Sequence, residues 1–281
     1  MSHFNNLKGN CTAATVALQQ ARKARRLSQL ELSMRLQVSQ RHVSFVESGR
    51  AKPSRQLLTA WLRELDAPLA LRNAAMLQAG YAPAYSFNKL GDPTLLHAND
   101  ALLQLLGAHD PMPAFVVDAQ WNLLHLNRGA AWLVATLMPW TAELLATPRA
   151  GGAGMNLLEA MVHPEGFTRH ITNLTEVGPA LLAHLRDDAS VQPSLTPKVE
   201  ALAAMLRDRL GSQSLHTGWP RSAAPVLTTR FATVHGELAF FSMFTTFGTP
   251  QDITLASLRV EHMFAADART KGVLQAQVIS V

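Results

Sequence analysis

Five residues between positions 39 and 45 have side chains suited to contacts with nucleic-acid bases. They are Ser39, Gln40, Arg41, Ser44 and Phe45, within the stretch VSQRHVSFVESGR. An arginine can donate two hydrogen bonds to guanine, a glutamine can bond adenine or phosphate, and serine hydroxyls reach bases or backbone. A phenylalanine ring in the major groove can pack on a thymine methyl group. These residue types predict contact with double-stranded DNA.

The spacing of these residues supports the prediction if the stretch is a helix. At about 100° per residue, Val43 and Val46 lie within about 60° of each other and form a buried face. Arg41, Ser44 and Phe45 then lie on the opposite face. In an alternative interpretation, Phe45 folds back over a following helix as part of the core and Arg41 is only solvated.

Basic residues follow this stretch directly. Arg50, Lys52 and Arg55 flank Pro53, where a loop would lie beside the DNA backbone; we interpret them as phosphate contacts, and charge for solubility is the alternative. Before residue 91 the chain has 13 basic and 4 acidic residues, whereas the remainder has 12 basic and 16 acidic residues. A polyanionic partner is therefore expected for the N-terminal third alone.

The elements that position these residues can be read from helix-capping signals. Ser28, Ser39 and Ser54 each precede a helical pattern, Glu31 completes a capping box with Ser28, and Gly49 ends a helix. Helices are predicted over 13–26 (starting at Thr12 or Thr15), 29–36, 40–48, 55–65 and, opened by Pro68, 69–80. The short corner at 37–38 makes the second and third helices a helix-turn-helix, whose second helix is the recognition helix.

A second domain is predicted after a linker at 82–92. Helices are expected over 94–110, 128–138, 155–163, 165–189 and 194–211, with strands within 114–127, 225–234, 237–248 and 253–264. This order predicts an α+β domain in which helices cross one face of an antiparallel sheet, as in PAS-like sensor domains. The domains are placed at 12–81 and 93–275.

Two of the late strands have different patterns. In 253–264, Ala256, Leu258 and Val260 alternate with polar residues, which predicts one wet face. In 237–248 both faces are apolar, so this strand is expected to be covered on both sides. Helices can cover one side; a second subunit, the N-terminal domain or a helix from the chain's own start would cover the other.

Signals for catalysis, metal binding and export are weak. GGAGMN lacks both common phosphate-binding patterns, His163 and Glu165 are explained equally well by a helix-ending turn, and the histidines lack metal-ligand spacing. Cys11 is the only cysteine, no signal peptide is evident, and no apolar run is long enough to span a bilayer. We therefore expect a cytoplasmic protein that is not an enzyme.

The segment LSQLELSMRLQVSQRHVSFVESGRAKPS resembles the Xre/Cro-type helix-turn-helix of bacterial and phage repressors. The resemblance implies that Gln29 contacts phosphate, that residues 39–41, 44 and 45 are the reader positions, and that Glu47 is structural. One departure is Gln37, which stands where glycine is usual, so this corner needs a left-handed residue that is not glycine.

The rest of the chain resembles the ligand-binding region of the MmyB-like transcriptional regulators. The resemblance is carried by MPAFVVDAQWNLLHLN, MNLLEAMVHPEG and FFSMFTTFGTPQDITLASLRVEHMFAAD. It implies a PAS-like domain that holds a fatty-acid-like or other lipophilic molecule and no further cofactor; a bound haem or flavin is the alternative. Candidate lining residues are Met161, Phe167, Ile171, Phe240 and Phe244, and candidates to face a carboxylate are Arg128, His163, Arg169 and His170.

Because one recognition helix covers only a few base pairs, we expect a homodimer. Its two recognition helices would read a pseudo-palindromic operator with half-sites about one helical turn, roughly 34 Å, apart.

Overall fold

The computed structural model describes residue 15 and residues 18–142, 154–211 and 226–279. The chain divides into two compact units, Met1–Asn88 with Thr249–Ala256, and Lys89–Gly248 with Ser257–Val281. The first division falls inside the segment predicted as a linker. No helix among the described residues is long and apolar enough to cross a membrane.

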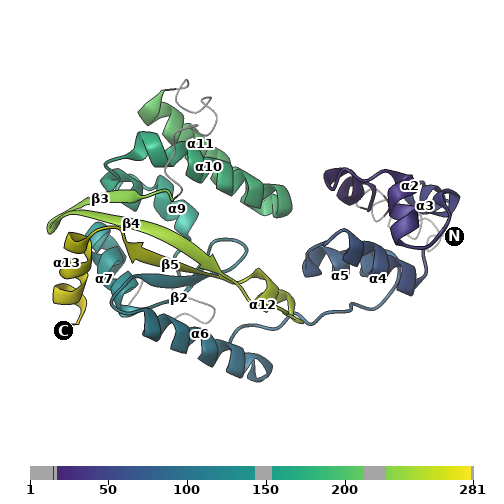
Figure 1. Ribbon diagram of the computed structural model, residues 1–281, viewed down its shortest axis with the longest axis horizontal. Helices are drawn as coiled ribbons and strands as arrows, with labels where there is room; N and C mark the ends of the chain where they lie inside the picture. The colour runs from purple at the N-terminus through teal and green to yellow at the C-terminus, as the bar shows by residue number, and fades with distance from the viewer. Residues whose placement is uncertain (1–14, 16–17, 143–153, 212–225, 280–281) are drawn as a thin grey trace, which may run out of the picture. The chain divides into compact units, whose positions relative to one another are not determined.

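The N-terminal unit is helical, as predicted (Figure 1). Its described helices are residues 18–24, α2 (Gln29–Arg35), α3 (Gln40–Glu47), α4 (Arg55–Glu64) and α5 (Leu69–Gln78). Thr12 lies outside the described residues, as does Cys11. Four of the five predicted helices are thus present with bounds that differ by one or two residues, because their capping signals are local.

The predicted caps and the left-handed corner are confirmed. Ser28 and Glu31 form both hydrogen bonds of a capping box, and the hydroxyls of Ser39 and Ser54 accept from the backbone N–H three residues on. Gln37 has φ 55°, and Val38 N–H donates to the Ser33 carbonyl across the corner at 3.0 Å. The α2–α3 corner is therefore made with glutamine in a conformation that favours glycine.

A buried ion pair joins the first helix to α3. The Arg22 guanidinium donates to both oxygens of Glu47, at 2.6 and 2.9 Å, and the two side chains are 8% and 2% exposed. Gln29 donates a third hydrogen bond to Glu47 at 2.8 Å. Burial by itself raises the pKa of Glu47, but the hydrogen bonds from Arg22 and Gln29 and the charge of Arg22 outweigh it and hold that pKa below its ordinary value.

The C-terminal unit is an α+β domain built on one antiparallel sheet. The strands are β1 (Ala114–Val117), β2 (Leu123–Leu126), β3 (Thr229–Thr233), β4 (Gly236–Thr245) and β5 (Arg259–Ala265), in the order β2-β1-β5-β4-β3. The helices of this domain are α6 (Leu96–His109), α7 (Arg128–Leu137), α9 (Leu157–Val162), α10 (Leu174–Val191), α11 (Thr196–Leu210) and α13 (Ala268–Val278), with 3-10 turns at Pro93–Leu95, Pro139–Thr141, Phe167–His170 and Pro193–Leu195. The short helix α12 (Ile253–Ser257) falls between β4 and β5 in the chain, and its residues up to Ala256 belong to the first unit.

Helices lie on both sides of this sheet rather than on one. Helices α9, α10 and α11 lie on one side and α6 on the other (Figure 1). On the α6 side, His125 of β2 hydrogen-bonds Asn99 of α6 at 2.9 Å, and the ring of His109 packs edge-on against that of His262. The domain's own first helix therefore lies over the second face, a covering that differs from the second subunit, the N-terminal domain and the helix from the chain's own start that the sequence suggested.

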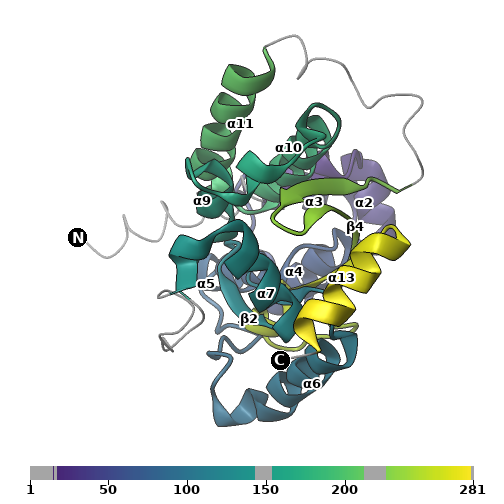
Figure 2. The ribbon, with the colours of Figure 1, turned by 90° about the vertical axis from the view of Figure 1, so that its left-hand side faces the viewer.

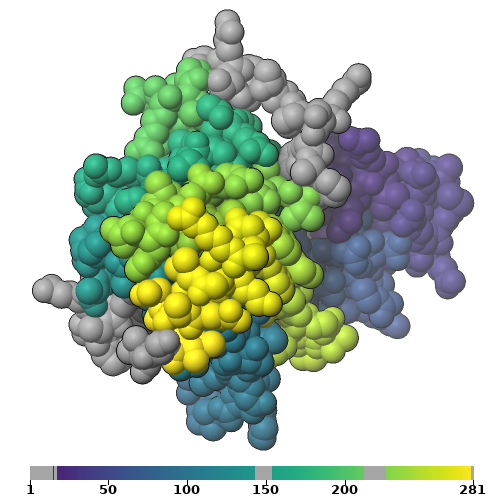
Figure 3. All heavy atoms as spheres, turned by 60° about the vertical axis from the view of Figure 1, so that its left-hand side comes forward, coloured from purple at the N-terminus to yellow at the C-terminus, as the bar shows by residue number. Residues whose placement is uncertain are grey.

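The C-terminal helix α13 closes one end of the domain. It contacts α7 and β4, and Thr270 Oγ accepts a hydrogen bond from Ala239 N–H at 2.9 Å (Figure 2). Its yellow surface lies against the green surface of the late strands in Figure 3.

The predicted strand over 253–264 is wrong in its first half. Residues Ile253–Ser257 form α12, and β5 begins only at Arg259. The Asp252 carboxylate accepts from Thr254 N–H at 2.8 Å and from Leu255 N–H at 3.4 Å, so it caps a helical turn. The apolar alternation of Ala256 and Leu258 was therefore not a strand pattern.

Two other expectations need correction. The helix predicted over 165–189 is broken, because Thr172 N–H donates to the Arg230 carbonyl of β3 at 2.9 Å, which interrupts the helical hydrogen bonds between the 3-10 turn and α10. Strand β4 is covered on both faces only in its first half: Leu238 is buried, whereas Met243 is 54% exposed.

The strain at Gln37 predicts opposite effects for two substitutions. Gln37→Gly should leave the free energy of unfolding unchanged or raise it by up to about 1 kcal/mol, because glycine adopts positive φ without a steric penalty. Gln37→Val should lower it by roughly 1–3 kcal/mol, since a β-branched residue is disfavoured there. Urea unfolding followed by circular dichroism measures both; equal stability of the two variants would contradict the assignment.

The buried ion pair predicts a large cost for its removal. Glu47→Ala should lower the free energy of unfolding by about 3–5 kcal/mol, because Arg22 remains buried without its partner. Glu64→Ala, which removes an exposed pair with Arg35, is the control and should cost less than about 1 kcal/mol.

The same pair predicts a pH dependence. Because the folded-state pKa of Glu47 is lowered, its stabilisation is present above the unfolded-state pKa and is lost as the pH falls through the folded-state value. Acid titration of stability should therefore show a smaller loss in Glu47→Gln than in the wild type. An identical pH dependence in both proteins would contradict this account.

Candidate functional site

The recognition helix α3 separates a buried face from an exposed one. Val43 and Val46 are both 0% exposed in the helical core, whereas Gln40 and Arg41 are exposed and Ser44 is half-buried. The division matches the faces that the sequence predicts for a helix over this stretch.

Phe45 lies outside the core, between two guanidinium groups. It is half-buried and does not belong to the hydrophobic cluster that the described residues of this unit form. The guanidinium carbons of Arg41 and Arg50 lie 5.1 and 5.9 Å from its ring centroid. The structure therefore differs from the core interpretation: the ring supports two cations through cation–π contacts on the outer face.

The remaining candidate DNA contacts surround α3. Ser39 caps the helix, and its hydroxyl accepts from His42 N–H at 3.1 Å. Gln29, at the start of α2, is held by its bond to Glu47, so the buried ion pair fixes its side chain. Exposed Lys52 places its ammonium 4.8 Å from the ring centroid of Tyr81. These side chains present hydrogen-bond donors and positive charge, which suits bases and phosphates.

A large apolar cavity lies in the C-terminal unit between the sheet and the helices α7, α9 and α10. Its volume is about 800 Å³. Its walls include Leu133 and Leu137 of α7, Val177 and Leu181 of α10, and Met263 of β5. Cavities of roughly 300–1,000 Å³ with mostly apolar walls and few polar groups are typical of small-molecule sites.

Four of the five proposed apolar lining residues lie in the cavity wall. These are Met161, Phe167, Ile171 and Phe244. Phe240 does not line it; at 1% exposure it is buried in the core beside Phe231, with 6.3 Å between the two ring centroids. The sequence alone could not show whether a residue at this strand position lies in the cavity wall or in the core.

The four candidates to face a carboxylate lie outside the described cavity wall. Arg128 pairs with Asp110 and is 65% exposed, and Arg169 pairs with Glu165 on a turn of the surface and is 55% exposed. His163 is exposed and stacks on Trp140 with 4.3 Å between ring centroids, and His170 is half-buried without lining the cavity. None of these four side chains therefore lines the described part of the cavity.

The polar residues that do line the cavity were missed from the sequence. They are Ser242 of β4, Glu261 of β5, Thr229 of β3, and His184 and Asp187 of α10. The alternation of β5 had placed Glu261 on a wet face together with Arg259. An acidic residue inside the apolar run VEHMF was the available signal.

One end of the cavity carries a polar cluster around Trp121. The indole N–H of Trp121 donates to Asp188 at 3.0 Å, and Asp188 also pairs with Arg259 at 2.8 Å. The Arg259 guanidinium lies 5.4 Å from the Trp121 ring centroid. His184 stacks on Phe244 with 5.7 Å between ring centroids. The charge of Arg259, at the start of β5, is thus already paired with that of Asp188.

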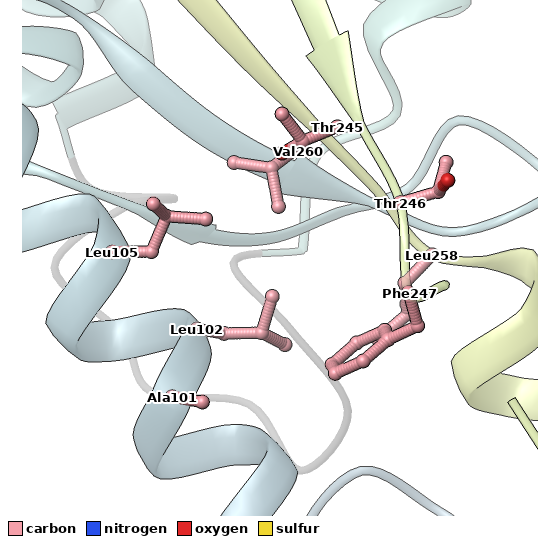
Figure 4. Close-up of a pocket in the computed structure, with 8 residues that line it drawn as sticks. All are labelled: Ala101, Leu102, Leu105, Thr245, Thr246, Phe247, Leu258 and Val260. Carbon is pink, nitrogen blue, oxygen red and sulfur yellow. The ribbon is translucent and has the colours of Figure 1, made fainter. Parts of the chain in front are cut away.

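A second, smaller cleft of about 100 Å³ lies on the other face of the sheet. Leu102 and Leu105 of α6 face Val260, Leu258 and Phe247 there (Figure 4). Its size suits packing of α6 rather than a ligand. Within the described residues, no group of three or more His, Cys, Asp or Glu side chains could hold a metal ion.

Both units of the chain match known families. Residues 18–71 match the helix-turn-helix family, and residues 98–276 match the MmyB-like transcription regulator ligand binding domain. No curated protein matches the chain. A helix-turn-helix domain with an exposed recognition helix, followed by this ligand-binding domain, is the architecture of a DNA-binding transcriptional regulator. The chain belongs to the MmyB-like transcription regulators.

Proposed function

We propose that this regulator reads a pseudo-palindromic operator as a homodimer and responds to a lipophilic small molecule held in the C-terminal cavity. The observation that carries the proposal is the cavity of about 800 Å³ with mostly apolar walls in a ligand-binding domain. A homodimer supplies two recognition helices, which doubles the sequence that one short helix can read.

Arg41 is the proposed base-reading residue of the recognition helix. It is exposed and its guanidinium lies 5.1 Å from the Phe45 ring centroid, which restricts the arginine before DNA is bound. A restricted side chain loses less conformational entropy on binding, so the aromatic contact favours base recognition. Phe45 is only half-buried and would contact a thymine methyl, and Ser39, Gln40 and Ser44 would contribute nearby polar contacts.

Arg50, Lys52 and Gln29 are the proposed phosphate contacts. Arg50 and Lys52 follow the recognition helix and are exposed. Gln29 is positioned at the start of α2 by Glu47. Contacts of this kind set affinity and orientation without distinguishing sequences.

The apolar walls favour a fatty-acid-like chain or another lipophilic body. Phe167, Met161 and Leu133, from three different helical segments, face strand residues such as Phe115 and Phe231 across the cavity. Apolar ligand surface buried against such walls gains about 25 cal/mol per Å² before the costs of association.

The loop between β4 and β5 offers a physical route from ligand to DNA. Both strands contribute cavity walls, whereas residues Thr249–Ala256 belong to the N-terminal unit. Asp252 is 4% exposed and accepts from Ser86 Oγ at 2.7 Å and from Asn88 N–H at 3.2 Å. A ligand shifts the regulator only if it binds one arrangement of this loop more tightly than another.

Substitution of Arg41 and Lys52 should separate base reading from phosphate binding. Arg41→Ala should cost about 1–3 kcal/mol on an operator selected from random DNA and relax its base preference. Lys52→Ala should weaken binding to all sequences and lower the salt slope by about one. Fluorescence anisotropy on selected and random duplexes measures both, and the symmetry of the selected sites reports on the dimer.

Arg63→Ala is the matched control, because Arg63 is an exposed arginine of α4 in the same unit. It should leave operator affinity nearly unchanged. An equal loss on operator and random DNA for Arg41→Ala would rule out its role as a reader.

A cavity-filling substitution should test the lipophilic site. Ala180 of α10 lines the cavity, so Ala180→Phe should weaken binding of the neutral dye Nile red by about tenfold or more, which corresponds to at least about 1.4 kcal/mol. Ala204→Phe, on the exposed side of α11, is the control and should bind as the wild type does. Dye fluorescence and mass spectrometry of organic extracts measure occupancy.

Equal dye binding by the Ala180→Phe variant and the wild type would show that the dye does not enter this cavity. Visible absorption bands in the purified protein would instead support a bound haem or flavin.

A further inference from the structure

The sheet places a carboxyl group between two aromatic rings on the floor of the cavity. Strand β5 pairs with β1 on one side and β4 on the other, and the register sets Phe115 and Phe244 directly opposite Glu261. Directly paired residues of an antiparallel sheet have Cβ atoms about 4.5–5.5 Å apart on the same face. All three residues line the cavity.

Glu261 lacks a cationic partner among the described residues. Burial raises the pKa of its carboxyl, and the neighbouring Ser242 hydroxyl offsets this only in part. None of the ion pairs between described residues includes Glu261, and the nearby Arg259 pairs with Asp188 instead. The cavity therefore holds an acidic group whose charged form is disfavoured until a positive charge approaches.

We propose that the cavity binds a lipophilic amine, whose ammonium group lies at Glu261 between the rings of Phe115 and Phe244. This inference rests on the proposed lipophilic site and specifies the polar group of its ligand. The Glu261 carboxylate would form an ion pair and a charge-assisted hydrogen bond with the ammonium group. The faces of the two aromatic rings would attract the same cation through their quadrupoles.

The remaining lining supports an amine over a carboxylic acid. Asp187 adds a second acidic group, and no lysine or arginine lines the described part of the cavity. A ligand carboxylate would face the acidic side chains of Asp187 and Glu261 and would find no lysine or arginine to pair with, which raises its free energy in the cavity. A neutral alcohol could hydrogen-bond Glu261 but would gain neither charge pairing nor the cation–π contacts.

Three probes with the same alkyl chain separate these chemistries. Dodecylamine, dodecanol and dodecanoic acid are titrated into the full-length protein below their micelle-forming concentrations near neutral pH, with isothermal calorimetry as the measurement. Dodecylamine should bind about tenfold or more tightly than dodecanol, and dodecanoic acid should bind most weakly, since charge pairs at buried sites exceed the roughly 1.4 kcal/mol of a tenfold difference.

Glu261→Gln should remove the preference for the amine and retain binding of dodecanol, because glutamine keeps the shape and loses the charge. Glu237→Gln is the matched control: Glu237 is an exposed glutamate of β4 that pairs with Arg230 outside the cavity wall. It should keep the wild-type preference. Circular dichroism establishes that each variant is folded.

Phe244→Leu provides a second test that does not alter the Glu261 carboxyl. Phe244 is 39% exposed, so its replacement should be tolerated, and it should weaken dodecylamine by several-fold while changing dodecanol little. An equal loss for both probes would count against the aromatic contribution.

The results distinguish failure of this inference from failure of the lipophilic site. Equal binding of amine and alcohol, tighter binding of the acid, or an unchanged amine preference in Glu261→Gln would overturn the amine and leave the lipophilic site standing. Failure of all three probes to bind, together with no effect of Ala180→Phe on Nile red, would overturn both.

Discussion

Strand β5 lies at the centre of the sheet, paired with β1 and β4, and its register fixes which side chains reach the cavity. Successive residues of a strand point to opposite faces of the sheet. A shift of the register by one residue would therefore move every side chain of β5 to the other face. In the observed register Glu261 and Met263 face the cavity, while Val260 packs towards α6 and His262 contacts His109. The polarity of the ligand site thus depends on backbone pairing that extends across most of the sheet.

The helix-turn-helix depends on a comparable internal constraint. Glu47 accepts hydrogen bonds from Arg22 and Gln29, so one buried carboxylate connects the first helix, the start of α2 and the end of the recognition helix. The outer face of α3 is then organised by a weaker contact, in which Phe45 supports Arg41 and Arg50. Phe45 is an apolar residue on the polar face of its helix, and its cationic neighbours explain this position, because they cover the ring in place of the core.

The accuracy of the sequence predictions follows the range of the interactions behind them. Helices α2 to α5 were predicted closely because serine caps and glycine stops act within three or four residues. Ile253–Ser257 was assigned to a strand because its alternation is ambiguous over five residues, and the Asp252 cap decided the matter. The break after His170 depends on hydrogen bonds to β3, some sixty residues on in the chain, which no local pattern reports.

By itself, the sequence determined the two-domain order, the helix-turn-helix with its left-handed corner at Gln37, and the confinement of excess positive charge to the N-terminal third. These properties are local or compositional, so they do not require knowledge of distant neighbours. The tertiary structure decided which residues form the cavity: it placed Glu261 inside and left Arg128 and Arg169 on the surface. Membership of a cavity depends on strand register and on the helices that cross the sheet, because these bring together residues that lie far apart in the chain.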